Sequence, residues 1–168
     1  EEVGRYYEEN LNNFLLSQDV IQGTYVKVTQ DAPRITELRR WSWNNRPEDL
    51  DNMEKYSLNY AEKYDDFNNS WVYFSSIKSQ FPMTISNPSR FLSYNKNLET
   101  TDENYRYFLH ISDHLPEGEP APVELVHNDI VSIILNKRKI EFFRDMEQRV
   151  YSDGVSRNQF EIYETADQ

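Results

Sequence analysis

Val126–Tyr151, VHNDIVSIILNKRKIEFFRDMEQRVY, has the longest continuous helical pattern in the chain. Its apolar residues recur three, four or seven positions apart, which places them on one face of an α-helix. Such a helix would be roughly 35 to 40 Å long at ~1.5 Å per residue. A second apolar patch, formed by Ile134, Leu135 and Phe142, indicates that the helix is covered on more than one side. We therefore expect a rod that joins two parts of the molecule.

The chain before this helix predicts a sheet with helices packed on it. Alternating β-branched residues predict a strand over Asp19–Thr29, in which Gly23 marks a bulge or a close approach. The start pattern Asp31–Pro33 predicts one helix, and a second is expected over Pro47–Tyr64. The polar run Asp65–Ser70 is then a loop, whose two carboxylates form either a site or a solvated turn.

The following segments predict a hairpin and a boundary. Asn97–Thr101 and Tyr105–Ser112 are expected to pair as antiparallel strands. Asp113–Pro122 is rich in proline, so it predicts irregular structure and the main internal boundary. Beyond the long helix, Gly154 is a stop signal and Gln159–Glu164 alternates like a terminal strand. This order predicts an α+β fold, with an antiparallel sheet covered by helices, then a long C-terminal helix and a terminal strand. The smaller elements expected are a strand at Trp71–Phe74, a helical turn at Ile77–Phe81 and a brief helix from Pro88.

Composition argues against several classes of function. The chain has no cysteine, so neither a disulfide framework nor a zinc-thiolate site is expected. Its formal net charge is −11 and its basic residues are scattered, which disfavours nucleic-acid binding. With four glycines, a phosphate-binding loop is not expected, and no apolar run is long enough to cross a bilayer. His110 and His114 would lie ~13 Å apart along a strand, too far to share a metal. We expect neither a metal nor a cofactor.

Aromatic residues offer the first functional indication. The chain contains 3 Trp, 12 Tyr and 9 Phe. Accessible Tyr and Trp side chains bind polypeptides with little loss of entropy, although most single rings in any protein belong to its core. The composition therefore favours a role in peptide binding. Because the chain opens at Glu1 inside a helical pattern, we interpret it as a fragment whose beginning is absent.

Three segments carry a resemblance to a known family. They are WVYFSSIKSQF at 71–81, YRYFLHI at 105–111 and NKRKIEFFRDMEQRVYSDGVSRNQFEIY at 136–163. Together with the order of elements, they resemble a parvulin-type peptidyl-prolyl isomerase domain set into a helical peptide-binding domain, as in SurA- and PrsA-like chaperones. The last segment is similar to a divergent branch of lipid-anchored periplasmic members. The resemblance implies the end of a helical domain at 1–16, a parvulin-like domain at 17–114, and at 115–168 a linker, long helix and strand that pack with the helical part.

The catalytic positions depart from the family pattern. Parvulins carry two histidines behind the proline pocket, and the resemblance places Tyr25 and Tyr107 at those positions. A one-residue slip would place Thr24 in the first position instead. The acidic position corresponds to Asp66 or to Asp65, in the shortened loop DDFNNS. Prolyl isomerisation needs a pocket that holds a twisted imide, so shape can persist without turnover.

The resemblance implies a periplasmic, lipid-anchored folding or secretion chaperone that binds unfolded or extended polypeptides, including outer-membrane proteins, with weak or no isomerase activity. The alternatives are an active prolyl isomerase and a structural subunit of an envelope complex, docked through the long helix. The degenerate catalytic positions Tyr25 and Tyr107 could also contact peptide. The expected peptide-binding residues are Trp71, Tyr73, Phe74, Phe81 and Phe91.

Overall fold

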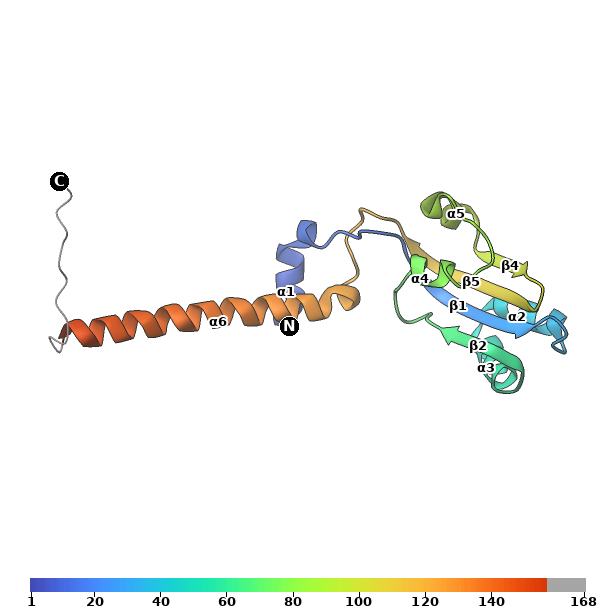
Figure 1. The fold of residues 1–168 in the computed structure, drawn as a ribbon, viewed down its shortest axis with the longest axis horizontal. Helices are drawn as coiled ribbons and strands as arrows, with labels where there is room; N and C mark the ends of the chain where they lie inside the picture. The colour runs from blue at the N-terminus through green and yellow to red at the C-terminus, as the bar shows by residue number, and fades with distance from the viewer. Residues whose placement is uncertain (157–168) are drawn as a thin grey trace.

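A computed structural model describes residues 1–156 of the chain. A five-stranded antiparallel sheet forms one end of the molecule, and helix α6 (Val123–Ser156) extends away from it as a rod (Figure 1). The predicted α+β class, with helices on an antiparallel sheet and a long C-terminal helix, is confirmed. The strands lie in the order β2 (Ala61–Asp66), β1 (Val20–Thr29), β5 (Tyr105–Leu115) and β4 (Asn97–Thr101), and the short β3 (Val72–Tyr73) also pairs with β1.

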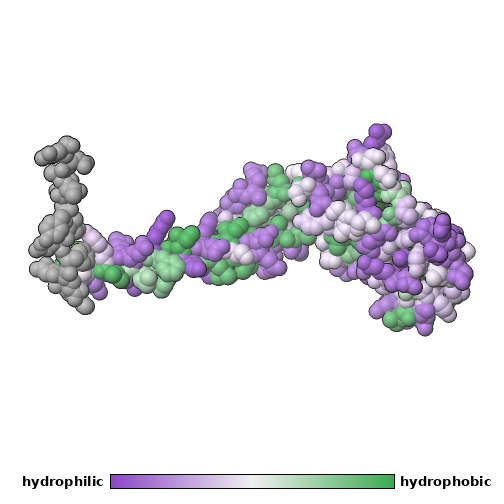
Figure 2. Space-filling view, in the orientation of Figure 1, coloured by the Kyte–Doolittle hydropathy of each residue, from purple (hydrophilic) through white to green (hydrophobic). Residues whose placement is uncertain are grey.

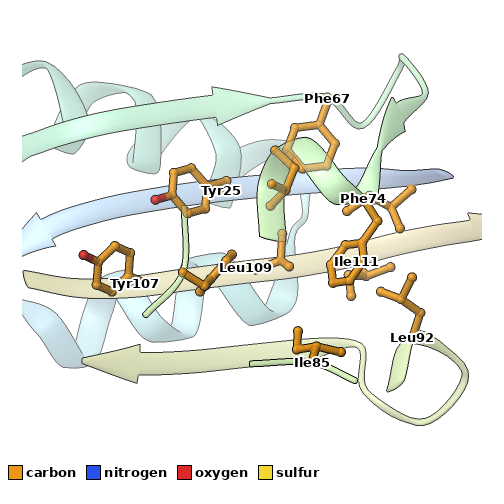
Figure 3. Close-up of a cluster of buried hydrophobic side chains, with 11 residues drawn as sticks. Tyr25, Phe67, Phe74, Ile85, Leu92, Tyr107, Leu109 and Ile111 are labelled. Carbon is orange, nitrogen blue, oxygen red and sulfur yellow. The ribbon is translucent and has the colours of Figure 1, made fainter. Parts of the chain in front are cut away.

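The two faces of the sheet are buried by different helices. Side chains alternate between faces along a strand, so Val26 and Phe108 lie on one face, with Tyr25 and Leu109 on the other. Helices α2 (Ile35–Asn44) and α3 (Pro47–Tyr60) cover the first face. The second, which we call the tyrosine face, is covered by α4 (Phe74–Lys78), α5 (Pro88–Tyr94) and the segment between them (Figure 3).

Gly23 lies where β1 bulges against β5. The pairing register shifts between Gln22 and Gly23, and Gly23 has a φ of 155°. A Cβ atom at this position would lie 1.9 Å from the carbonyl oxygen of His110. The close approach expected from the sequence is confirmed, because only a residue without a side chain fits here.

The prediction of a helix from Pro47 to Tyr64 was wrong at its end. Helix α3 stops at Tyr60 and the chain continues directly into strand β2, so Asp65 is not in a loop. Tyr64 opposes Val26 and Asp65 opposes Tyr25 in the β1–β2 pairing. Residues 61–64 fit a helical pattern, but they form a strand instead. Hydrogen bonds to β1 and the packing of Tyr64 beside α2 and α3 stabilise the strand.

Other element ends also differ from the prediction. Strand β5 runs to Leu115 and pairs His114 with Ile21, so the first part of Asp113–Pro122 is regular, contrary to expectation. Helix α2 begins after Arg34, which adopts a left-handed conformation, rather than at Asp31. The end of β5 is set by its pairing with the distant strand β1 rather than by a local signal.

Helix α6 is longer than expected at both ends. It begins at Val123 and continues through Gly154 to Ser156, so Gly154 is not a stop. Its 34 residues correspond to a rod of about 51 Å at 1.5 Å per residue. The terminal strand predicted at Gln159–Glu164 lies outside the described residues.

The N-terminal helix α1 (Glu2–Glu9) packs against the first part of α6. Rings of Tyr6, Tyr7 and Phe14 gather with Ile130 and Ile134, and a short 3₁₀ helix, η1 (Leu11–Asn13), follows α1. The Tyr7 hydroxyl donates a hydrogen bond of 2.7 Å to the carbonyl of Ala121. The segment that enters the sheet before β1 and the segment that leaves it after β5 therefore lie next to each other beside α1.

Those two segments form a short ribbon. The amide of Leu16 donates to the carbonyl of Glu119 at 2.8 Å, and the amide of Gly118 donates to the carbonyl of Leu16 at 2.9 Å. Leu16 also packs with Val20 and Ala121 in a small core between the sheet and α6. The connection between the two parts is therefore paired and partly buried.

Candidate functional site

The two tyrosines at the degenerate catalytic positions come from the central strands of the sheet. Strands β1 and β5 pair side by side, with Tyr25 opposite Leu109 and Tyr107 opposite Lys27. This register puts Tyr25 and Tyr107 on the tyrosine face, whereas Thr24 points to the α2–α3 side. The structure thus selects Tyr25 rather than Thr24 as the neighbour of Tyr107 (Figure 3).

Phe81 closes the space between these tyrosines. Its ring centroid lies 5.4 Å from that of Tyr25 and 5.8 Å from that of Tyr107. Tyr25 is fully buried, and Phe81 is only 7% exposed. The family resemblance implies a pocket for a proline ring here, but the core side chain of Phe81 occupies the position.

The two hydroxyls have different surroundings. Tyr107 donates a hydrogen bond of 2.5 Å to Asp102, and burial together with this carboxylate raises the pKa of Tyr107 to about 12. The buried Tyr25 hydroxyl has no hydrogen-bond partner among residues 1–156. Burial chiefly, and then Tyr107 and Asp65, raise the pKa of Tyr25 well above its ordinary value. Both phenols are therefore protonated near neutral pH, and neither can act as a base.

Two lysines lie beside the tyrosines. Lys27 and Lys63 oppose each other across β1 and β2, on the tyrosine face. The Lys27 ammonium lies 3.8 Å from the ring centroid of Tyr105, and that of Lys63 lies 5.9 Å from the ring centroid of Tyr25. Neither lysine was predicted from the sequence to belong to the site. Lys27 lies two residues from Tyr25, and Lys63 lies two residues from Asp65, so each pair shares a face of the sheet if both segments are strands. This spacing could be used only once 61–66 was known to be a strand.

The acidic position has a structural role in this arrangement. Asp66, the last residue of β2, accepts hydrogen bonds from the backbone amide of Asn68 at 3.0 Å and from its side-chain amide at 2.9 Å. Asp65 pairs with Lys63 at 3.1 Å. Asp66 therefore stabilises the turn that follows β2, whereas Asp65 lies within the strand rather than in the solvated turn that the sequence offered. No group of three His, Asp or Glu side chains within residues 1–156 is arranged to hold a metal ion.

The expected peptide-binding aromatics separate into core and surface. Phe74 is 1% exposed and belongs, with Phe81, Tyr25 and Tyr107, to the core of the tyrosine face, so a polypeptide can reach these four residues only if a covering side chain moves. The sequence spacing of these aromatic residues is compatible with either burial or exposure. The sequence alone therefore could not tell which of the rings are buried. Trp71 is half-buried, and Tyr73 is 41% exposed.

Phe91 is the candidate that lines an open cavity. This cavity, of about 350 Å³, lies beside α5 and is also lined by Met83, Arg90 and Tyr94. Tyr94 is 80% exposed. A polypeptide side chain can therefore reach Phe91 from solvent.

Two of the three histidines, His110 and His114, have structural partners. His110 lies 2.7 Å from the side-chain oxygen of Asn97, and burial, with a smaller effect of Lys96, lowers the pKa of His110. His114 lies 2.7 Å from the buried carboxylate of Asp19, which also accepts a hydrogen bond of 2.9 Å from Ser89. The carboxylate lies between the hydroxyl and the imidazole, so the histidine does not activate Ser89 as a nucleophile. The arrangement instead ties β5 and α5 to the start of β1.

Eight of the fifteen exposed large hydrophobic residues within residues 1–156 lie on the outer part of α6, residues 135–156, which we call the α6 arm. Of the patch that was expected to be covered, Ile134 is buried against α1, but Leu135 and Phe142 are 57% and 64% exposed. Apolar groups recur along the rod in Figure 2. No helix within residues 1–156 combines the length and apolar character needed to span a membrane. The exposed large apolar residues of the arm are Leu135, Ile140, Phe142, Phe143, Met146, Val150, Tyr151 and Val155.

These side chains occupy two faces of the arm. Leu135, Phe142, Met146 and Val150 follow one another at intervals of seven or four residues, so they form one stripe. Ile140 and Tyr151 are eleven residues apart, which is three turns of helix, and they lie away from this stripe. The arm therefore presents apolar side chains on more than one side, as the sequence predicted.

No protein-family model matches this chain, and no match was found among curated proteins or among solved structures.

Proposed function

We propose that this protein is a polypeptide-binding module of a folding or secretion chaperone, with a parvulin-like sheet domain and no prolyl isomerase turnover. The observation that carries the proposal is the α6 arm, which exposes eight large apolar side chains, among them Phe142 at 64% and Val150 at 66%. Monomeric proteins seldom expose contiguous apolar surface of this kind unless it binds something. The periplasmic, lipid-anchored setting is part of the proposal and derives from the resemblance.

The shape of the arm favours polypeptide over a small ligand. Small molecules bind in concave cavities, whereas the arm is a convex rod about 30 Å long at 1.5 Å per residue. Apolar side chains on more than one side suit segments that wrap around the helix or pack along it as further helices. Phe142 and Phe143 supply large rings, and Met146 supplies a flexible side chain that adapts to different partners.

The tyrosine face supports the absence of turnover. A prolyl isomerase needs an open apolar pocket, but Phe81 fills the space between Tyr25 and Tyr107. The Tyr107 hydroxyl is already bonded to Asp102. An active isomerase is therefore the less favoured alternative.

The test is suppression of aggregation of an unfolded, proline-containing client, measured by light scattering, with exchange NMR of an aromatic-proline peptide run in parallel. Phe142→Asp and Val150→Asp should each weaken client binding about tenfold, because a charge replaces an apolar contact. Gln148→Asp is the matched control, since it adds the same charge at an exposed polar position of the arm. Unchanged protection by both apolar variants would contradict the proposal, and so would catalysed exchange in the NMR experiment.

The arm also favours a second candidate, a structural subunit of an envelope complex docked through α6. Such a subunit would bind one stoichiometric partner and would not protect unrelated clients. Co-purification of that partner, lost on Phe142→Asp and retained on Gln148→Asp, would replace the chaperone proposal with this one.

A further inference from the structure

The cross-strand lysines on the tyrosine face form an unusual pair. Lys27 and Lys63 are direct partners in the β1–β2 register, so their side chains leave the same face of the sheet next to each other. Like charges directly opposite each other destabilise a sheet unless an anion lies nearby. The positions and partners of the neighbouring carboxylates, Asp65 and Asp102, therefore show how far the two positive charges are compensated.

Both neighbouring carboxylates already have partners. Asp65 forms an ion pair with Lys63 at 3.1 Å. Asp102 accepts hydrogen bonds from the Tyr107 hydroxyl at 2.5 Å and from the backbone amides of Asn104 and Tyr105 at 2.9 and 2.7 Å. Lys27 takes part in none of the ion pairs of residues 1–156, although its ammonium lies over the Tyr105 ring and, after the larger effect of the hydrogen bond from Tyr107, its charge contributes to the lowered pKa of Asp102.

A buried hydrogen-bond donor faces the same region. The Tyr25 hydroxyl is fully buried and has no partner among residues 1–156. Figure 3 shows the hydroxyls of Tyr25 and Tyr107 directed toward the same end of the sheet. A buried donor without an acceptor is costly, and in native proteins such a group commonly marks a place where a ligand, ion or water binds.

We propose that Lys27, Lys63 and the Tyr25 hydroxyl bind the carboxylate of an acidic side chain in a polypeptide segment that also carries aromatic residues. A carboxylate has enough lone pairs to accept hydrogen bonds from both ammonium groups and from the phenol. The Lys63 side chain is 43% exposed, so it can turn outward to admit the segment. The half-buried ring of Tyr105 offers apolar contact beside the charge.

This inference rests on the proposed function, because it names one kind of segment that the chaperone would select. It uses a different surface from the α6 arm. A failure here leaves the arm experiment intact, and the Phe142→Asp variant should keep this site.

The test compares two peptides that differ at one position. Both are N-acetylated and C-terminally amidated, and they carry either Glu or Gln between two aromatic residues. Binding is measured by NMR titration of the full chain. The Glu peptide should bind about tenfold more tightly than the Gln peptide, and this preference should shrink as salt is added.

Variants assign the effect to the site. Lys27→Gln and Lys63→Gln should each remove most of the preference for the Glu peptide, whereas Lys55→Gln, an exposed lysine on α3, makes the same change in net charge and should keep it. Tyr25→Phe should also reduce the preference without lowering the unfolding midpoint, because it deletes a buried hydroxyl that has no partner. Equal binding of the two peptides, binding of neither, or an equal loss in Lys55→Gln would overturn the proposal.

Discussion

Gly23→Ala should severely destabilise the sheet domain. The added Cβ would lie 1.9 Å from the carbonyl oxygen and 2.9 Å from the carbonyl carbon of His110, both of which are backbone atoms. No side chain can move aside to relieve this contact, so β1 and β5 must separate. Gly23 also exchanges backbone hydrogen bonds with Phe67, of 2.9 and 3.4 Å, at the end of β2.

The expected cost follows from three contributions. Overpacking costs about 1 to 3 kcal/mol, two weakened backbone hydrogen bonds cost about 1 kcal/mol each, and a left-handed φ at a residue with a side chain costs about 1 to 3 kcal/mol. We expect Gly23→Ala to lower the free energy of unfolding by about 4 to 8 kcal/mol. This is a large part of the ~5 to 15 kcal/mol typical of a domain.

Urea unfolding followed by tryptophan fluorescence measures this change, since Trp41 is buried in the α2–α3 core. Two glycine controls separate the clash from other effects, because a Cβ at Gly118 or Gly4 would meet no atom within 4 Å. Gly118→Ala, at φ 89°, should cost about 1 to 3 kcal/mol through its backbone alone. Gly4→Ala, in helix α1, should be neutral or stabilising by up to about 1 kcal/mol. A cost below about 1.5 kcal/mol for Gly23→Ala would refute the reasoning.

Two further predictions concern the sheet and its core. Hydrogen bonds from Arg39 and then from Arg106 lower the pKa of Glu99, so this group stabilises the fold above the pKa of the unfolded chain, and its contribution is lost as pH falls through the folded pKa. Urea midpoints of wild type and Glu99→Gln should therefore differ at pH 7 and converge in acid, and a constant difference would contradict this assignment. Phe81→Ala should cost about 3 to 5 kcal/mol by the same assay, because it leaves a cavity between two buried rings. Leu58→Ala, at a residue 83% exposed, should change stability little, and equal costs for both would show that Phe81 is not a core residue.

Much of the fold was predictable from local patterns. The strand Val20–Thr29 alternates β-branched residues, and the hairpin of β4 and β5 is bounded by polar residues, so both elements appear where the sequence placed them. The long helix was predicted because its apolar spacing persists over many turns. Strand β2 was missed, since Ala61–Asp66 acquires its structure through hydrogen bonds to β1 rather than from its own residues.

The candidate site was harder to predict. Tyr25 and Tyr107 were expected to be neighbours, and they are. Their surroundings were not predictable, because Phe81 reaches the space between them from a segment more than fifty positions away in sequence from Tyr25. Lys63 could not be assigned to the tyrosine face before β2 was known. The contact of Phe81 with Tyr25 and the pairing of Lys63 with Lys27 were not predictable because the residues lie far apart in the sequence.

The amino-acid sequence by itself determined the class of the fold, the existence of a long helix with apolar residues on more than one side, and a bulge or close approach at Gly23. These properties depend on spacing and backbone freedom, which are local. Only the tertiary structure decided which aromatic rings are core and which are surface, because burial depends on what packs against a ring. It placed Phe74 and Phe81 inside the sheet domain, left Phe142 and Val150 in solvent, and brought Lys27 and Lys63 together beside a buried hydroxyl.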